Sequence, residues 1–239
     1  MNSNNNSIAV MQPYIFPYIG YFQMIAAVDK FVFYDDVNFI KQGWINRNRI
    51  KVAGKDFMFT IPLDKPNSFT KINKTLIKTI SYEKWRRKIL RTINQNYKKA
   101  PYFNSIYPLI YNTLNQEKET ISELSIFSVK TIAEYLDLNT HFIISSEAYQ
   151  NSELDRQQRI LDICSIEKAS LYINAIGGKD LYNKKDFLKQ NVELRFINSR
   201  TVEYNQFSDE FIPWLSIIDV LMFNSKEKVK DFLNMYELF

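Results

Sequence analysis

The 239-residue sequence has one cysteine, one histidine and five glycines, and each of these low counts excludes a class of protein. The single Cys164 rules out an intrachain disulfide framework, and no Cys/His cluster has the spacing of a zinc site. The single His141 argues against Ser-His-Asp and Cys-His catalytic mechanisms. Five glycines leave little room for a glycine-rich phosphate loop. We therefore expect a protein of the reducing cytoplasm with no metal site and no tightly bound cofactor.

Long hydrophobic runs are also absent, since none approaches the roughly 18 residues that a membrane span requires. Residues 1–7 are polar and rich in asparagine, and they lack the basic and apolar regions of a signal peptide. We expect them to form a disordered tail. The rest of the chain is globular in composition, with 46% hydrophobic and 15% aromatic residues, and predicts one domain. An oligomer is compatible with this composition.

The charge is distributed unevenly along the chain. Lys41 to Lys99 contains 16 basic and three acidic side chains, whereas the remaining residues carry a net charge of −8. A segment this basic could attract ligands that bear phosphate, or it could be a solvated face that pairs with the acidic part.

The most distinctive stretch is residues 12–22, Gln-Pro-Tyr-Ile-Phe-Pro-Tyr-Ile-Gly-Tyr-Phe, which follows a short apolar run and precedes a run of helical period. Its two prolines predict a stiff loop between a strand and a helix. We expect Gly20 to permit the turn into the helix, because glycine adopts positive φ without steric cost. Aromatic loops at strand ends are places where open α/β sheets bind ligands. The alternative is a connection held by aromatic packing alone.

A second β-type run, residues 30–34, ends at Asp35 and Asp36, so residues 7–34 predict a β-loop-α-β unit with parallel strands. The carboxyl ends of both strands then share one edge of the sheet, which places Gln12 near the two aspartates. Adjacent residues of a strand alternate faces, so only one of the two carboxylates can point into a given site. Either could act as a base, orient an amine or bind a metal, and a simple turn is the alternative.

The remaining pattern predicts an α/β fold, with a mainly parallel sheet built from β-loop-α-β units and a helical insertion or subdomain around 82–137. Residues 45–61 predict a β-hairpin. Strands are expected at 140–145, 170–174 and 192–197, and helices at 154–164 and 184–190. The chain is expected to end in helices, at 213–223 and from residue 226 onward.

Three further groups of residues are candidates for ligand contacts. On an extended segment Asn46 and Asn48 share one side and Arg47 and Arg49 the other, and arginine forks match a diphosphate, although a solvated strand has the same pattern. The strand ending at Asn174 leads into Gly177 and Gly178, whose backbones can approach a ligand closely or form an ordinary turn. Asp219 lies in an apolar helix, where it either reaches solvent or is buried with a partner.

The sequence resembles the WbqC-like protein family over nearly its whole length. The resemblance is most specific in Gln12-Pro13-x-x-x-Pro17-x-x-Gly20-Tyr21-Phe22, in Phe31-Val32-Phe33-Tyr34-Asp35-Asp36-Val37, and in Lys41 with Trp44-Ile45-Asn46-Arg47-Asn48-Arg49-Ile50. It continues through Tyr172-Ile173-Asn174, Gly177-Gly178, Tyr182, Tyr204-x-Gln206 and Leu215-Ser216-Ile217-Ile218-Asp219. One departure is Ser225 after Asn224, where family members often carry glycine.

The resemblance implies a role in bacterial O-antigen or other surface-polysaccharide (lipopolysaccharide) biosynthesis. It implies a transferase that moves glycine or another acyl group to the amine of a nucleotide-linked amino sugar. An acyl-CoA, a carrier protein and an aminoacyl-tRNA are the donors that fit. We assign catalytic roles to Asp35, Asp36 and Gln12. We assign substrate binding to Pro13, Tyr14, Tyr18, Tyr21, Lys41, Trp44, Asn46, Arg47, Asn48, Asn174, Gly177, Gly178, Tyr182 and Gln206.

Two alternatives remain open. The strand-loop-helix opening also resembles the signature loop of class I nucleotidyltransferases and tRNA synthetases, which would make the protein a nucleotide- or ATP-using transferase. Tyr18 and Tyr21 stand where those enzymes carry histidines, so their catalysis does not transfer to this chain. The other alternative is a non-catalytic accessory protein that binds a sugar nucleotide.

Overall fold

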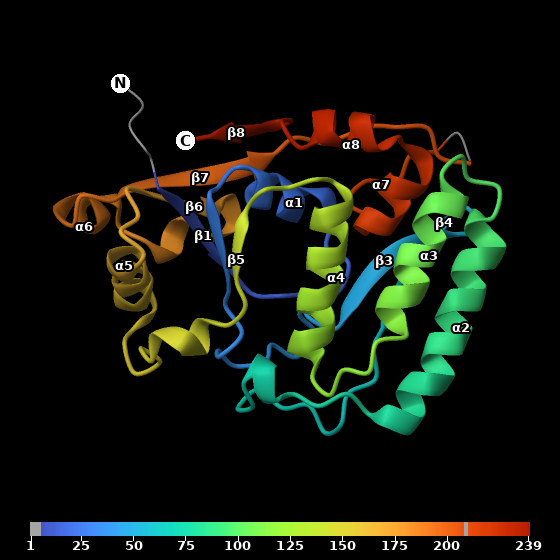
Figure 1. Ribbon diagram of the computed structural model, residues 1–239, viewed down its shortest axis with the longest axis horizontal. Helices are drawn as coiled ribbons and strands as arrows, with labels where there is room; N and C mark the ends of the chain where they lie inside the picture. Colours follow the sequence, from blue (N-terminus) through green and yellow to red (C-terminus); the bar gives the residue numbers. More distant parts are fainter. Residues whose placement is uncertain (1–5, 208–209) are drawn as a thin grey trace.

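The computed structural model describes residues 6–207 and 210–239 and confirms the α/β fold. Its main sheet has the strand order β5-β2-β1-β6-β7-β8, in which only β8 is antiparallel (Figure 1). These strands are β1 Ser7–Met11, β2 Lys30–Phe33, β5 His141–Ile143, β6 Leu171–Ala175, β7 Glu193–Ser199 and β8 Tyr236–Leu238. The expected unit over residues 7–34 is present, because β1 and β2 pair in parallel through α1 (Ile19–Ala26).

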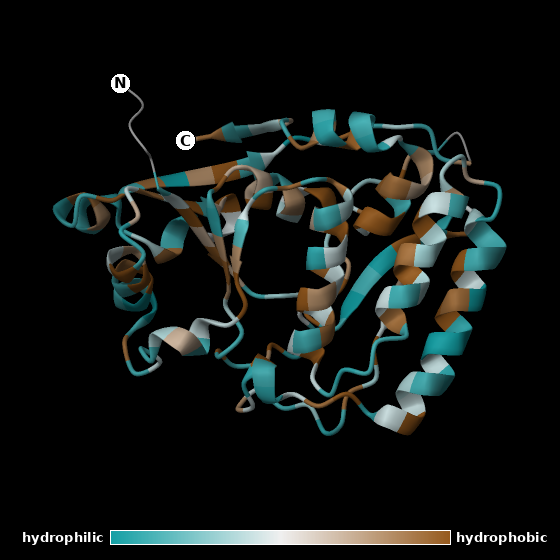
Figure 2. Cartoon of the chain, in the orientation of Figure 1, coloured by the Kyte–Doolittle hydropathy of each residue, from teal (hydrophilic) through white to brown (hydrophobic). Residues whose placement is uncertain are grey.

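The sheet is buried on both faces, and successive strand residues alternate between two hydrophobic clusters. Ala9 and Phe31 face α1, in a cluster that continues into the helical half of the molecule. Ile8 and Val32 face the other way, toward α5 (Arg156–Ile166) and α6 (Lys184–Lys189). In Figure 2 the hydrophobic colour accordingly gathers on the central strands.

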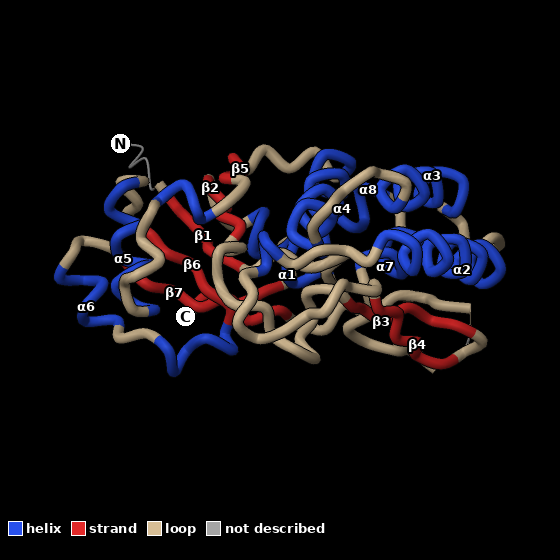
Figure 3. The backbone as a smooth tube through the Cα atoms, turned by 90° about the horizontal axis from the view of Figure 1, so that it is seen from below, coloured by secondary structure: helices blue, strands red, loops and turns tan. Residues whose placement is uncertain are grey.

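The other half of the molecule is mainly helical. Figure 3 shows its helices grouped at one end, with the β3–β4 hairpin beneath α2. Its elements are β3 Arg47–Val52, β4 Lys55–Thr60, α2 Thr79–Tyr97, α3 Phe103–Leu114, α4 Ile121–Tyr135, α7 Ile217–Phe223 and α8 Lys226–Phe232. The hairpin prediction is confirmed. At the start of α4, Thr120 and Glu123 form a capping box. The division into one domain with a helical subdomain at 82–137 stays a prediction.

Short 3₁₀ turns complete the fold, at Ile72–Lys74, Ser146–Tyr149 and Ile176–Leu181. The last of them contains Gly177 and Gly178, where the sequence predicted a loop. Within the described ranges, no helix combines the length and the apolar character needed to cross a bilayer.

Two sequence expectations are wrong at the ends of the chain. The expected tail over residues 1–7 includes Ser7, but Ser7 begins β1, and its backbone N–H and hydroxyl donate to Asp29 Oδ2 at 2.8 and 2.6 Å. Residues 1–5 of that tail lie outside the described part. The chain also does not end in a helix, because β8 pairs with β7. A three-residue strand carries too little periodicity to be detected.

Candidate functional site

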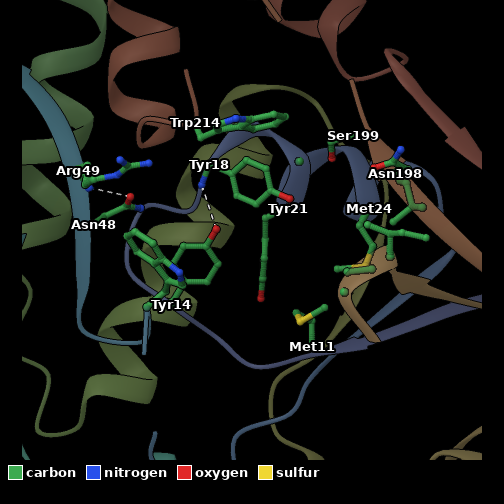
Figure 4. Close-up of a pocket in the computed structure, with 16 residues that line it drawn as sticks. Met11, Tyr14, Tyr18, Tyr21, Met24, Asn48, Arg49, Asn198, Ser199 and Trp214 are labelled. Atoms are coloured by element: carbon green, nitrogen blue, oxygen red, sulfur yellow. Dashed lines mark hydrogen bonds between the residues drawn. The ribbon is translucent and has the colours of Figure 1, made fainter. Parts of the chain in front are cut away.

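A cavity of about 480 Å³ lies where the winding of the sheet changes direction. The connection after β1 runs to β2 on one side, and the connection after β6 runs to β7 on the other. Open α/β sheets bind ligands at such a point, outside the carboxyl ends of the strands. The cavity is shown in Figure 4. It is lined by Met11, Tyr14, Tyr18, Gly20, Tyr21, Met24, Trp44, Asn48, Arg49, Ala175, Ile176, Gly177, Ile197, Asn198, Ser199 and Trp214.

The loop between β1 and α1 is fixed by polar contacts from three distant elements. Phe16 has a φ of 42°, which is uncommon for a large side chain, and its ring is almost fully buried. Asn48 Nδ2 and Ser216 Oγ both donate to its carbonyl oxygen, at 2.5 and 2.7 Å. Its backbone N–H donates to Ser128 Oγ at 3.2 Å. The hairpin, α7 and α4 together therefore hold the loop in this conformation.

Aromatic side chains form much of the cavity wall. Tyr14 packs edge-on against Tyr21 with ring centroids 5.2 Å apart, and Tyr18 packs against Trp214 at 5.9 Å. The Tyr14 hydroxyl accepts the backbone N–H of Tyr18, and the Tyr21 hydroxyl donates to the carbonyl of Gln12. Burial raises the pKa of both Tyr14 and Tyr21 well above the usual tyrosine value, so both rings are neutral.

Gly20 lies in the first turn of α1 and lines the cavity. The sequence predicted that it permits a turn into the helix, but the structure shows another reason for glycine at this position. A Cβ atom there would lie 2.3 Å from Ser199 Oγ and 2.4 Å from the Tyr18 ring. The left-handed residue of this loop is Phe16 instead. Glycine is therefore needed at position 20 because α1 approaches β7 closely, and not because the chain turns there.

Two arginines flank Trp44 beside the cavity. The guanidinium carbons of Arg47 and Arg49 lie 5.7 and 5.6 Å from its ring centroid. Arg49 also pairs with Asp56 at 3.2 Å, through Nη1. The Nε atoms of both arginines are buried without a hydrogen-bond partner among the described residues. Buried donors of this kind are normally satisfied, so an anionic ligand at Trp44 would complete their hydrogen bonds.

Asp35 lines a second cavity, of about 650 Å³, at the carboxyl ends of β2 and β5. Of the residues that the structure describes, none lines both cavities. Asp35 is 4% exposed, and its two carboxylate oxygens accept hydrogen bonds from Ser122 at 2.8 Å and Ser145 at 2.6 Å. Burial raises the pKa of Asp35 above the usual aspartate value. No ion pair neutralises this carboxylate among the described residues.

Asp36 has a different environment, since its side chain is buried against the guanidinium of Arg159 on α5. The hydroxyl of Ser146 also donates to it. The two neighbouring carboxylates therefore differ, because Asp35 lines the second cavity and Asp36 lines neither of the two. Within residues 6–207 and 210–239, no group of three or more His, Cys, Asp or Glu side chains could hold a metal ion.

The structure brings Tyr14, Tyr18, Tyr21, Trp44, Asn48 and Gly177 together at the first cavity. It distributes other predicted site residues through the fold. Asn46 Nδ2 donates to the carbonyl of Ile61 at the base of the hairpin. Asn174 is buried beneath Gly178, where a Cβ atom would lie 2.3 Å from its Nδ2. Tyr182 packs against Tyr172 in the cluster below α5 and α6.

The last predicted site residues also lie outside both cavity linings. Gln12, Pro13 and Lys41 line neither cavity, and Lys41 is exposed. Gln206 instead belongs to a buried network around Asp219. Its Nε2 donates to Asp219 Oδ1 at 2.9 Å, and its Oε1 accepts Lys51 Nζ at 2.8 Å. Asp219 is thus buried with partners rather than turned to solvent.

Sequence reasoning missed Trp214, Asn198 and Ser199, which all line the first cavity. Asn198 and Ser199 end β7, and the rule that ligands bind at strand ends could have indicated them. Trp214 has a φ of 60° and is 43% exposed. It comes from an irregular segment about 200 residues after the aromatic loop, so no sequence spacing connects the two.

Comparison with known proteins identifies the group to which this architecture belongs. A family model described as the WbqC-like protein family matches residues 12–231. The chain belongs to this family. A relative, an uncharacterized protein of Mycobacterium tuberculosis, is 28% identical over 229 residues, which cover 95% of this chain and 96% of the relative. No solved structure matches the chain. The WbqC-like match begins at Gln12, the first residue of the loop that forms the cavity wall.

Proposed function

We propose that the protein is an amino-sugar N-acyltransferase that transfers glycine or another acyl group to a nucleotide-linked amino sugar. The aromatic cavity at the point where the sheet changes winding direction is the observation that carries this proposal. Its volume of about 480 Å³ lies in the range of small-molecule sites, and its wall combines apolar rings with a few polar groups. A nucleotide base would stack on these rings, which contribute roughly 1–3 kcal/mol per base in other proteins.

The arginines beside Trp44 supply the contact for the diphosphate. Arg49 lines the cavity and Arg47 lies against the same indole ring. Their buried Nε groups have no hydrogen-bond partner in the described part of the chain, and a guanidinium donates two parallel hydrogen bonds to a phosphate. The nucleoside and the diphosphate of one ligand would therefore contact neighbouring parts of the wall.

Asp35 is the carboxylate that we propose as the base. It accepts one proton of the sugar ammonium group, and the freed amine attacks the acyl carbonyl carbon. The bond between the acyl carbon and the leaving group then breaks, and the leaving group departs with its electrons and takes up the second proton that the nitrogen loses as the amide forms. A raised pKa suits this role, because a stronger base binds the proton more readily. Asp35 lines the second cavity, so a nucleotide held in the first cavity must extend its sugar to the second.

The experiment is to incubate the protein with UDP-glucosamine and with glycyl-tRNA, an acyl-CoA or an acyl carrier protein, and to follow the sugar by mass spectrometry. A gain of the acyl mass on the sugar is the expected result. Binding without any product would favour the accessory role and contradict the proposed reaction.

Variants can locate the nucleotide site separately. Trp44→Ala should weaken UDP-glucosamine binding about tenfold or more, as measured by calorimetry, because a stacking surface is lost. Trp85→Ala is the matched control, since Trp85 stacks on Tyr82 and lines neither cavity. Equal binding by both variants would place the nucleotide elsewhere.

A nucleotide- or ATP-using transferase is the second candidate, and the strand order favours it. Numbered along the chain, the parallel strands lie in the order 3-2-1-4-5, which is the order of dinucleotide-binding sheets. Release of pyrophosphate from a nucleoside triphosphate, with no acyl product, would support this candidate instead.

A further inference from the structure

The loop of residues 64–76 and the amino end of α2 form a surface at one edge of the molecule, at the bottom of Figure 1. An antiparallel bridge between Leu63 and Ile77 closes the base of the loop. Leu63, Ile72 and Ile77 are all buried and belong to the main hydrophobic cluster. The loop is therefore anchored on its inner side, and its exposed residues project from a fixed base.

The outer side of this surface carries unusually exposed apolar side chains. Phe69 is 92% exposed and Ile80 is 87% exposed, the two highest values for large hydrophobic side chains in the described part of the chain. Leu76, between them in sequence, is 48% exposed. Single exposed apolar residues are ordinary, and these three stand out because they lie within 12 residues of sequence, Phe69 to Ile80.

Basic side chains are frequent in the same segment of the chain, in the loop and along α2. From Asp64 to Arg91 the sequence has nine basic residues and two acidic residues, Asp64 and Glu83. Lys74 is the one member of this set with an ion-pair partner among the described residues, and its contact with Glu147 at 3.6 Å is exposed. The charge of this surface is therefore largely uncompensated, and its complement is an extended anionic partner.

We propose that this surface docks the protein on an anionic phospholipid membrane, with Phe69 and Ile80 inserted among the acyl chains and the lysines at the lipid phosphates. Apolar side chains beside basic ones are the usual composition of proteins that bind in the bilayer interface. RNA is the other polyanion that fits the charge. It fits the apolar residues poorly, because the aliphatic Ile80 and Leu76 offer no ring on which a base can stack.

The proposal predicts an attachment that is reversible and does not depend on the proposed acyl transfer. Neither Phe69 nor Ile80 lines a cavity, so changing them leaves both candidate sites intact. Lys74, in contrast, lines the second cavity as well. Docking would therefore bring the cavity that contains Asp35 next to the lipid surface.

The experiment is co-sedimentation of the full chain with vesicles of equal parts phosphatidylglycerol and phosphatidylcholine, and with vesicles of phosphatidylcholine alone. We expect binding to the anionic vesicles to exceed binding to the neutral ones at least about tenfold, and to fall in about 0.5 M sodium chloride, where charges are screened within a few ångströms. Equal sedimentation with both kinds of vesicle would overturn the proposal.

Two double variants separate insertion from charge alone. Phe69→Ser with Ile80→Ser should reduce vesicle binding about tenfold, with the same thermal unfolding as the unchanged protein because both side chains are exposed. Leu181→Ser with Leu188→Ser is the matched control, because these side chains are 51% and 60% exposed on η3 (Ile176–Leu181) and α6. Unchanged vesicle binding by the first variant overturns the proposal, as does tighter binding of polyuridylic acid than of anionic vesicles.

Discussion

The two cavities lie at the same edge of the sheet, yet they differ in almost every chemical respect. The first lies at the ends of β1, β6 and β7, and its wall is aromatic, with Arg49 as the one charged side chain among the described residues that line it. The second lies at the ends of β2 and β5, and its wall is charged and contains the buried Asp35. Flat aromatic rings can stack on the nucleobase of a ligand, whereas a buried carboxylate can accept a proton from it. This difference fits the proposal that the first cavity binds the nucleotide and that the second contains the base for acyl transfer.

Asp35 and Asp36 present the same contrast between neighbouring residues. Asp36 is paired with Arg159, whereas Asp35 has two serine hydroxyls and a cavity. A buried carboxylate that is fully paired stabilises the fold, and one that lacks a cation is available to a ligand. Substitutions at these two positions should therefore have opposite effects on stability and on activity.

The largest effect on stability is expected from Asp36→Asn. The substitution leaves the Arg159 guanidinium buried without its counter-charge, and breaking a buried pair destabilises proteins by about 3–5 kcal/mol. Urea unfolding measures the loss. Asp35→Asn is the matched control, since it keeps the size of the side chain and breaks no ion pair. If the two variants unfolded at the same urea concentration, the structural role of Asp36 would be wrong.

Asp35→Asn should instead lower the rate of acyl transfer by about 100-fold or more, because a general base contributes roughly 10²–10⁴-fold. UDP-glucosamine should bind with only a modest loss of affinity, since the proposed contact of Asp35 is with the sugar amine and Asp35 does not line the first cavity. In the unchanged protein the rate should rise with pH through the pKa of Asp35, which lies above the usual aspartate value. An Asp35→Asn enzyme with full turnover would remove Asp35 from the mechanism.

The first cavity offers a matched pair of glycines. Gly20→Ala places a methyl group 2.3 Å from Ser199 Oγ, so we expect a loss of about 1–3 kcal/mol in the free energy of unfolding, together with weaker nucleotide binding. Gly177→Ala meets no atom within 4 Å and should leave stability unchanged. Thermal unfolding and calorimetry of both variants test this difference. Equal losses would mean that close packing at α1 does not shape the cavity.

Much of the fold was predictable because it rests on local patterns. The apolar run at residues 8–11, the β-type run at residues 30–34 and the loop between them predicted a parallel pair, which the structure confirms. The same reasoning placed Tyr14, Tyr18 and Tyr21 at a strand end, where they line the cavity. Periodicity and proline chemistry act over a few residues, so the sequence displays them directly.

The division of the site could not be predicted, because it depends on contacts between distant segments. Asp36 is neutralised by Arg159, which follows it by 123 residues. Asn48 was expected to bind substrate, yet it also fixes the loop through the carbonyl groups of Ile15 and Phe16. A single sequence shows donors and acceptors but does not show which of them satisfy one another.

The smallest effect concerns Asp219, which stabilises the elements behind the first cavity. It accepts hydrogen bonds from Tyr97 at 2.6 Å, Tyr204 at 2.7 Å and Gln206, and burial raises its pKa above the usual aspartate value of 3.8. The folded protein therefore holds this proton more tightly than the unfolded chain does. Stability from this group is complete below the unfolded pKa and is lost as the pH rises through the folded one.

Asp219→Asn has no carboxyl group to titrate, so its stability should not show this loss as the pH rises. The difference in free energy of unfolding between the variant and the unchanged protein should therefore change only between the unfolded and the folded pKa of Asp219. Urea unfolding at a series of pH values, from below 3.8 upward, measures it. Asp219 lines neither cavity, so UDP-glucosamine binding should stay within about twofold, a change of less than 1 kcal/mol. A large loss of binding would show that the shape of the first cavity depends on the hydrogen bonds around Asp219. Nucleotide binding in that cavity would then depend on the protonation of Asp219.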